Sequence, residues 1–367
     1  MAKKSANFDL VLLGIVLALL AVGLISLYSA SAVESFKRDG TSAYFIKKQL
    51  FGGVGLGFVA MYFAAKIDYH FWQKKLPILV VVSLGLLAAT KLTHLGITAG
   101  GASRWIDLGF ITFQPAELAK LVIVFYIAAW ISKKGKDIND FTFGLLPSLV
   151  IVSLFAAMIL WQPDFGTMSV LVGMAFLMMV AGGINWKYLF WGTLSGMLML
   201  YAVIHFEPYR LRRVTSFLDP ASDPQGISYH INQALIAIGA GGLWGYGYGL
   251  SRQKHSYLPE VMGDSIFAVT AEELGFLRVT AIIVLFMAFL AKGISLAKKA
   301  PDDFGRLTAF GITAWIAVQA IINIAAMVKL LPLTGIPLPF FSYGSSAMVI
   351  NLAAVGILMN ISKQSKA

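Results

Sequence analysis

Charged residues that could take part in chemistry lie at the ends of long apolar runs in this chain. Asp264 closes a charged stretch where one such run begins, and partial removal of water there would raise the pKa of its carboxyl group towards that of a general base. The same residue could cap the helix that the apolar run forms, and the two roles are compatible. Asp264 is therefore the strongest catalytic candidate in the sequence.

Basic residues in the same stretch could bind a phosphorylated substrate. Arg210, Arg213 and Lys254 precede Asp264, and guanidinium groups bind phosphate oxygens through paired hydrogen bonds. The arginines could equally anchor the chain to lipid headgroups. Glu260 completes this set as a further candidate for contact with substrate.

Four more charged residues lie nearer the N-terminus. Arg104 precedes an apolar run, and Glu117 and Lys120 fall inside it, three residues apart on one helix face. Asp164 separates two further apolar runs. We expect all four to contact substrate, although Glu117 and Lys120 could simply neutralise each other and Asp164 could simply cap a helix.

Several familiar kinds of site are disfavoured. The chain has no cysteine, so disulfides and thiolate chemistry are excluded. The glycines between Gly239 and Gly249 lack the flanking strand and helix of a dinucleotide site, and they indicate close helix packing or a flexible turn. No metal-ligand spacing joins the five histidines, which are His70, His94, His205, His230 and His255.

The elements that must position these residues are apolar helices. Hydrophobic residues make up 58% of the chain and charged residues 13%, and the mean hydropathy is +0.77. Such a composition is typical of a protein whose main solvent is lipid. The net charge of +11 is spread over many connections and forms no single patch, which disfavours nucleic acid as a partner.

Apolar runs of roughly 17 to 25 residues recur along the chain, each long enough to cross a hydrocarbon layer as a helix. We predict an all-α polytopic membrane protein with a single domain over residues 1–367. A long connection, about residues 207–264, separates the seventh and eighth spans and should hold short helices at the membrane surface. The ten predicted spans lie near residues 9–31, 48–66, 76–92, 114–132, 143–161, 166–182, 188–206, 266–291, 307–327 and 346–361.

The distribution of basic residues indicates the orientation of the chain. With the N-terminus inside, the inner segments carry 15 Lys and Arg and the short outer segments carry 7, so both termini should be cytoplasmic. The connection that holds Asp264 then lies outside. No inner connection is long enough for a nucleotide-binding domain, and no nucleotide is expected as a cofactor.

Five stretches of the sequence resemble signatures of the SEDS family (shape, elongation, division and sporulation). Residues 161–167, WQPDFGT, resemble its QPDLGT signature. The arginine-rich YRLRR stretch and residues 251–254 are more similar to FtsW, the division member, than to RodA, the elongation member. The other four stretches are RW at 104–105 leading to QPAE at 114–117, YRLRRVTSFLDP at 209–220, QKHSYLPEVMGDSIFAVTAEELGF at 253–276 and TGIPLPFFSYGSS at 334–346.

The resemblance implies a peptidoglycan glycosyltransferase that polymerises lipid II into glycan strands at the outer face of the bacterial cytoplasmic membrane, during septal or lateral wall synthesis. It implies a class B penicillin-binding protein as a partner, with other division or elongation proteins. The family's essential aspartate falls on Asp264. A divalent cation, Mg²⁺ or Mn²⁺, held by Asp264 or Asp164 could share the charge of the departing diphosphate.

The sequence is also compatible with two other functions. A flippase for the same lipid-linked precursor would show polar residues through the inner leaflet, or paired broken helices. A scaffold without catalysis would only position partner enzymes.

The sequence also departs from the family pattern in three places. Gly263 and Ser265 flank Asp264 where the pattern has T-D-F, residues 342–346 read SYGSS in place of SYGGSS, and Arg278 stands where glycine is common. Arg278 lies inside an apolar run, where a charge needs a partner or a polar cavity, and Glu272 or Glu273 is close enough along a helix to form such a pair.

Overall fold

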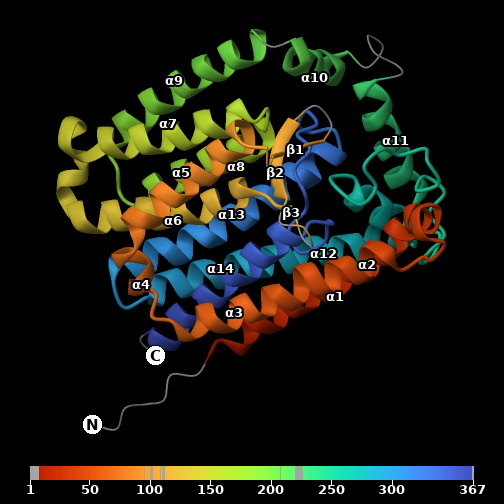
Figure 1. Cartoon of the computed structure of the whole chain (residues 1–367), viewed down its shortest axis with the longest axis horizontal. Helices are drawn as coiled ribbons and strands as arrows, with labels where there is room; N and C mark the ends of the chain where they lie inside the picture. The colour runs from red at the N-terminus through yellow and green to blue at the C-terminus, as the bar shows by residue number, and fades with distance from the viewer. Residues whose placement is uncertain are drawn as a thin grey trace.

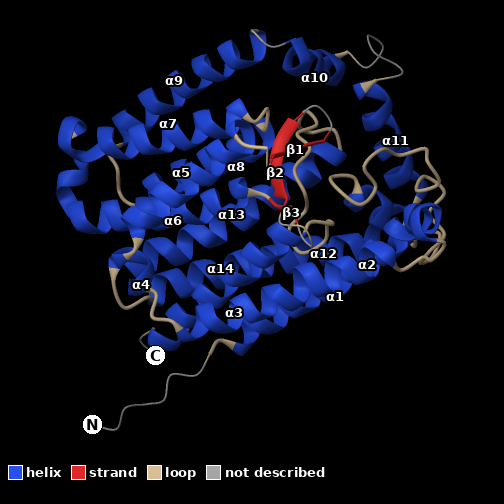
Figure 2. Cartoon of the chain, viewed as in Figure 1, coloured by secondary structure: helices blue, strands red, loops and turns tan. Residues whose placement is uncertain are grey.

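The computed structural model describes residues 8–94, 96–99, 102–107, 109, 112–206, 208–219 and 226–365. Apolar helices lie side by side through most of the molecule, and one small sheet lies among them (Figure 1 and Figure 2). Glu207 and residues 220–225, which belong to the long connection predicted between the seventh and eighth spans, lie outside the described residues.

Fourteen α-helices form the described part of the chain. They are α1 (Leu10–Asp39), α2 (Tyr44–Gln49), α3 (Leu56–Lys66), α4 (His70–Lys74), α5 (Leu76–Leu92), α6 (Pro115–Lys134), α7 (Leu146–Trp161), α8 (Phe165–Ala181), α9 (Trp186–His205), α10 (Pro208–Leu218), α11 (Ile227–Ala240), α12 (Ile266–Lys299), α13 (Asp303–Met327) and α14 (Ser345–Gln364). Wider π-helical turns, η1 (Leu50–Gly55) and η3 (Phe141–Leu145), join α2 to α3 and lead into α7, and a 3-10 turn, η2 (Gly135–Asn139), follows α6.

A three-stranded antiparallel sheet precedes α6, which the all-α prediction did not include. Its strands are β1 (Gly96–Ala99), β2 (Ala102–Asp107) and β3 (Thr112–Phe113), in that spatial order. The sheet was missed because the strands are short and the apolar periodicity that guided the prediction marks only the helices on either side.

Within the part of the chain that the structure describes, seven helices are long and apolar enough to cross a membrane, namely α1, α6, α7, α9, α12, α13 and α14. The chain is therefore a multi-pass membrane protein. The spans predicted at 76–92 and 166–182 fall on α5 and α8, which have 17 residues each. The span predicted at 48–66 falls on the consecutive helical run of α2, η1 and α3.

Close contacts at glycines join the central helices of the bundle. A methyl group on Gly356 of α14 would lie 2.3 Å from the Met61 carbonyl oxygen of α3, and one on Gly293 of α12 would lie 2.2 Å from Thr313 Oγ1 of α13. Small residues allow apolar helices to approach closely where lipid gives little drive for association. By contrast, α9 has no buried residue and lies along one side of the bundle in Figure 1.

The long connection lies at the end of the bundle away from the chain termini. Phe8 and Lys363 are in contact, with the ammonium nitrogen 5.4 Å from the ring centre. At the other end of α1, Lys37 donates a hydrogen bond of 2.9 Å to Ser256 Oγ. Because α1 has 30 residues, about 45 Å separates these two contacts along its axis.

Helix α12 is broken, whereas the sequence predicted an uninterrupted span. Gly275 has φ 77° and ψ 173°, a conformation that only glycine adopts readily. Four backbone hydrogen bonds join the break to the turn after α11. Before the break, the carbonyls of Glu272 and Glu273 accept bonds from the N–H groups of Tyr246 and Gly247, respectively. After the break, the N–H groups of Phe276 and Leu277 donate to the carbonyls of Gly242 and Leu243, respectively. The glycine cluster after α11 thus packs into the break in α12, and glycine is needed there because the two backbones lie in close contact.

Candidate functional site

Asp264 lies in a buried position immediately before α12. Only 9% of the residue is exposed, and its Oδ1 atom has no hydrogen-bond partner among the described residues. Its backbone carbonyl accepts a hydrogen bond of 2.9 Å from Asn323 Nδ2. The N-cap of α12 is Ser265, not Asp264. The capping alternative for Asp264 is therefore wrong.

Arg213 shares a small space with this carboxylate. A methyl group on Gly335 would lie 4.0 Å from Asp264 Oδ2, and 3.9 and 4.0 Å from the two terminal nitrogens of Arg213. Arg213 Nη1 also donates 2.8 Å to the Leu333 carbonyl, which fixes the guanidinium. Gly335 has φ +72°, so the turn that leaves this space open needs a residue tolerant of the left-handed region.

The charges around Asp264 set its protonation. Burial raises the pKa of Asp264 to about 6, against the opposing effect of the Arg213 charge. Partial burial and the nearby Asp264 charge raise the pKa of Glu260. Burial lowers the pKa of His230 to about 4, and its Nε2 lies 2.6 Å from Ser265 Oγ. At neutral pH the cluster therefore offers an ionised carboxylate of increased basicity, a fixed guanidinium and a neutral imidazole.

The segment between α13 and α14 organises this cluster. Asn323 Nδ2 donates 2.7 Å to the Ile336 carbonyl as well as to Asp264, and Ser342 Oγ donates 2.7 Å to the Gly263 carbonyl. The Tyr343 N–H donates 2.8 Å to Met262. Sequence reasoning assigned no site role to Asn323 or His230. A buried amide in an apolar helix is a signal that could have identified Asn323.

A second polar cluster surrounds Asp164 at the start of α8. Asp164 caps the helix by accepting bonds from Thr167 N and Oγ1, at 3.0 and 2.9 Å. Gln114 Nε2 lies 3.3 Å and Arg104 Nε 3.9 Å from Asp164 Oδ2. Arg104 also donates to the carbonyls of residues 162 and 163. The predicted cap is confirmed, and Arg104 lies beside Asp164.

The two clusters share one neighbour. A methyl group on Gly166 would lie 2.7 Å from the Thr334 carbonyl oxygen and 2.6 Å from the Ile336 side chain. Residues 334–336 therefore touch the start of α8 on one side, and Asp264 and Arg213 on the other.

Glu117 and Lys120 form a buried ion pair of 2.9 Å, with each residue 1% exposed. Lys120 Nζ also donates 2.7 Å to Gln319 Oε1 and lies 4.8 Å from the centre of the Trp315 ring. The pair neutralises itself in the helix core. This geometry supports the alternative that the two charges neutralise each other, although Glu117 Oε2 has no hydrogen-bond partner among the described residues. Contact of the two residues with substrate stays a prediction.

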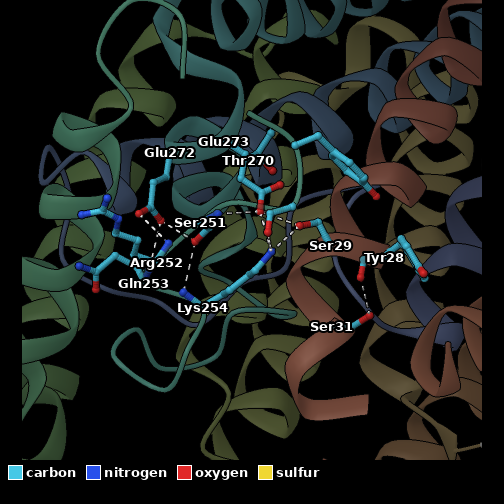
Figure 3. Close-up of polar contacts among 12 residues, drawn as sticks. Tyr28, Ser29, Ser31, Ser251, Arg252, Gln253, Lys254, Thr270, Glu272 and Glu273 are labelled. Atoms are coloured by element: carbon cyan, nitrogen blue, oxygen red, sulfur yellow. Dashed lines mark hydrogen bonds and ion pairs between the residues drawn. The ribbon is translucent and has the colours of Figure 1, made fainter. Parts of the chain in front are cut away.

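Lys254 is also engaged within the protein (Figure 3). Its Nζ atom donates to Ser29 Oγ at 2.9 Å, the Gly249 carbonyl at 2.7 Å and Glu273 Oε1 at 3.0 Å. An ammonium group has three donors, so none is left for a phosphate group. The role predicted for Lys254 in substrate binding is corrected to a structural one.

The neighbouring Glu272 has no cation against it among the described residues. Its carboxylate accepts bonds from Ser251 Oγ and from the N–H groups of Arg252 and Gln253. The possible pair of Arg278 with one of these glutamates does not form: Arg278 is exposed and donates 2.9 Å to the Trp244 carbonyl. The break at Gly275 turns the chain between Glu273 and Arg278, so helix spacing no longer brings them together.

The structure also shows what Arg210 contacts and how the candidate metal ligands are arranged. Arg210 Nη1 donates 3.2 Å to the Val203 carbonyl and so ties α10 to α9. Among the described residues, no group of three or more Asp, Glu or His side chains could hold a metal ion. The described parts of the Asp264 and Asp164 clusters therefore do not form a metal site from protein ligands alone.

Known proteins resemble this chain along its whole length. The family FTSW_RODA_SPOVE, described as "Cell cycle protein", matches residues 10–367. Stage V sporulation protein E of Bacillus subtilis is 41% identical over 367 residues, covering 100% of both chains. The probable peptidoglycan glycosyltransferase FtsW of Trichlorobacter lovleyi is 39% identical over 360 residues, covering 98% of this chain and 94% of its own.

Solved structures share the fold. A chain from a study of polymerization and crosslinking by a peptidoglycan synthase complex superposes with a TM-score of 0.79 at 26% identity, covering 97% of each chain. The Thermus thermophilus rod shape determining protein RodA superposes with a TM-score of 0.72 at 26% identity, covering 98% of each chain.

Proposed function

The chain belongs to the FtsW/RodA/SpoVE family of cell cycle proteins, and on that premise we propose that it is a peptidoglycan glycosyltransferase that polymerises lipid II. The observation that carries the proposal is the buried carboxylate of Asp264 with its raised pKa, beside the fixed guanidinium of Arg213. Relatives named as probable peptidoglycan glycosyltransferases support it.

In the proposed reaction, Asp264 accepts the proton of the acceptor sugar's 4-hydroxyl as that oxygen attacks the anomeric carbon of the donor strand. The bond from that carbon to the diphosphate breaks as the new glycosidic bond forms, with inversion. Arg213 stabilises the negative charge that develops on the departing diphosphate. The activated donor supplies the energy, so the reaction needs no nucleotide.

A divalent cation fits this site only as an ion shared with substrate. Mg²⁺ is often bound by one or two carboxylates together with phosphate oxygens. Asp264 Oδ1 is free of protein partners among the described residues. Asp264 would hold the cation together with the phosphate oxygens, and the cation would supply charge neutralisation for the diphosphate. Asp164 is a less suitable ligand because both of its oxygens accept bonds from protein groups.

We place this chemistry outside the cytoplasmic membrane. Ten spans are counted when α5, α8 and the run of α2, η1 and α3 join the seven long helices. An even number agrees with the contact between Phe8 and Lys363. The excess of basic residues then assigns both termini to the cytoplasm and the connection before Asp264 to the outside.

A class B penicillin-binding protein is the proposed partner, alongside other division or elongation proteins. Support comes from the similarity to a chain of a peptidoglycan synthase complex. A role at the septum is supported by the higher identity to proteins named FtsW, 39% for one of them, than to RodA at 26%. The relative named for stage V sporulation makes spore formation a further setting to test.

Polymer formation is the direct test. Purified protein, with its partner and lipid II, should produce glycan strands that resolve as a ladder on gels, and Asp264→Asn should not. Polymer yield from Asp264→Asn equal to wild type would refute the assignment of the base. Asp39→Asn makes the same chemical change at an exposed residue of α1 and should polymerise like wild type.

A flippase activity is tested separately, since α12 contains one of the broken helices that such a function would use. Vesicles with labelled lipid II would report transfer between leaflets. Transfer without any polymer, in the presence of the partner, would favour that alternative.

A further inference from the structure

A cavity of about 270 Å³ lies between the outer end of α1 and the loop that leads to Asp264. Glu34 and Lys37 of α1 line one side, and Ser256, Glu260 and Met262 line the other. The volume is near the lower end of the range of about 300 to 1,000 Å³ that is typical of small-molecule sites. The cavity therefore has room for one sugar-sized group rather than a long chain.

The walls of the cavity are fixed by bonds between distant segments. At its base, Lys254 links Ser29 of α1 to Glu273 of α12, and all three residues are buried (Figure 3). At its rim, Lys37 donates to Ser256 Oγ. The loop is thus held to α1 at two levels, which preorganises the space between them.

Two carboxylates line the cavity without a partner. Within the described residues, the side chains of Glu34 and Glu260 make no hydrogen bond or ion pair, although both line the same space. The adjoining wall is apolar and includes Val33 and Val261. Carboxylates accept hydrogen bonds from hydroxyl and amide groups, and an aliphatic wall suits the nonpolar face of a pyranose ring.

Both signs of charge line the cavity. Lys37 and Lys254 accompany Glu34 and Glu260, and the three donors of Lys254 are already used within the protein. A diphosphate therefore gains no net attraction from this lining, whereas Arg213 offers a cation at the Asp264 cluster. An uncharged polyhydroxylated group can instead donate to the two carboxylates.

The cavity adjoins the candidate base. The carbonyl of Glu260 accepts bonds from the N–H groups of Gly263 and Ser265, so a single turn joins the cavity wall to Asp264. The charge of Asp264 also affects the pKa of Glu260, as expected for near neighbours.

We propose that this cavity binds an N-acetylated sugar unit of the growing glycan strand, with Glu34 and Glu260 accepting its hydrogen bonds. This inference rests on the proposed polymerase function. A strand held here is retained between additions, so the cavity controls how long each strand becomes before release.

Strand length is the first readout. Glu34→Gln removes one charged acceptor, and a hydrogen bond to a charged group is worth about tenfold in affinity. At equal consumption of lipid II, the variant should make strands several-fold shorter than wild type. Asp39→Asn makes the same chemical change on the same helix outside the cavity, and should leave strand length unaltered. Equal strand lengths in the two variants would overturn the proposal.

Direct binding separates this inference from the polymerase function itself. The probe is chitotetraose, a soluble tetramer of β-1,4-linked N-acetylglucosamine, detected by saturation-transfer NMR with the full chain in micelles. Wild type, Asp264→Asn and Asp39→Asn should bind it, and Glu34→Gln should bind about tenfold more weakly.

Unchanged thermal midpoints for Glu34→Gln and Asp39→Asn would show that both variants are folded. Absence of binding to folded wild type, or equal binding by Glu34→Gln, refutes the cavity assignment whether or not polymer is made. Absence of polymer with binding intact refutes the polymerase function instead.

Discussion

Replacing Asp264 by asparagine should stabilise the protein at neutral pH while abolishing polymerisation. The pKa of Asp264 is raised from 3.8 to about 6 in the folded chain, so its ionised form is less favourable in the folded state than in the unfolded state. A shift of roughly 2 units corresponds to about 3 kcal/mol of destabilisation. This cost is fully present above about pH 6, shrinks as the pH falls, and is absent below about pH 4.

The assay is unfolding of the purified protein in one detergent at several pH values. At about pH 7.5 the Asp264→Asn variant should be more stable than wild type by up to about 3 kcal/mol, which corresponds to a thermal midpoint roughly 5 °C higher. Near pH 4 the difference should disappear, because the wild-type carboxyl group is then protonated in the folded state. Asp39→Asn, on an exposed residue, serves as the control.

Two results would refute this reasoning. Equal stability of wild type and Asp264→Asn at neutral pH would mean that burial does not raise the pKa of this carboxyl group. A gain of the same size in acid and at neutral pH would mean that the asparagine stabilises by packing or hydrogen bonding instead of by removing a charge.

Three other predictions concern the base, the buried Lys254 and the break in α12. Polymerase activity should fall about tenfold per pH unit below an apparent pKa near 6. Arg213→Met should move this acidic limb of the kcat/KM profile to higher pH, because a cation that lowers the pKa of Asp264 is lost. An unshifted limb would show that Arg213 does not affect the pKa of Asp264. Lys254→Met should destabilise the fold by about 3 to 5 kcal/mol, since Glu273 is left buried without its cation. In thermal unfolding, the double variant Lys254→Met with Glu273→Gln should recover part of this loss of stability. No recovery would argue against a charge effect. Gly245→Ala should sharply reduce the yield of folded protein in size-exclusion chromatography. Gly245 has φ +78°, and a methyl group on it would lie 2.2 Å from the Glu273 carbonyl oxygen. A yield equal to that of wild type would show that the turn can move.

The general architecture follows from local sequence properties. Apolar runs long enough to span a bilayer must form helices, because only intrasegment hydrogen bonds satisfy the backbone in lipid. That rule predicted the positions of α1, α6, α13 and α14, although α1 continues beyond the predicted span at its C-terminal end. It failed at the strands before α6 and at the break in α12, since short polar strands and a glycine inside an apolar run leave the overall hydropathy unchanged.

The apolar run that starts directly after Asp264 was enough to predict that its carboxyl group would lose water. Which charged side chains lie beside that carboxyl group depends on how the helices pack. Lys120 and Lys254 were as plausible as Arg213 from the sequence, yet each lysine is buried against a glutamate, and Arg213 shares the space beside Asp264. The physical reason is that a buried charge must be compensated by whatever lies nearest in space, and residues as distant as Ser29 and Glu273 become neighbours only after the helices pack.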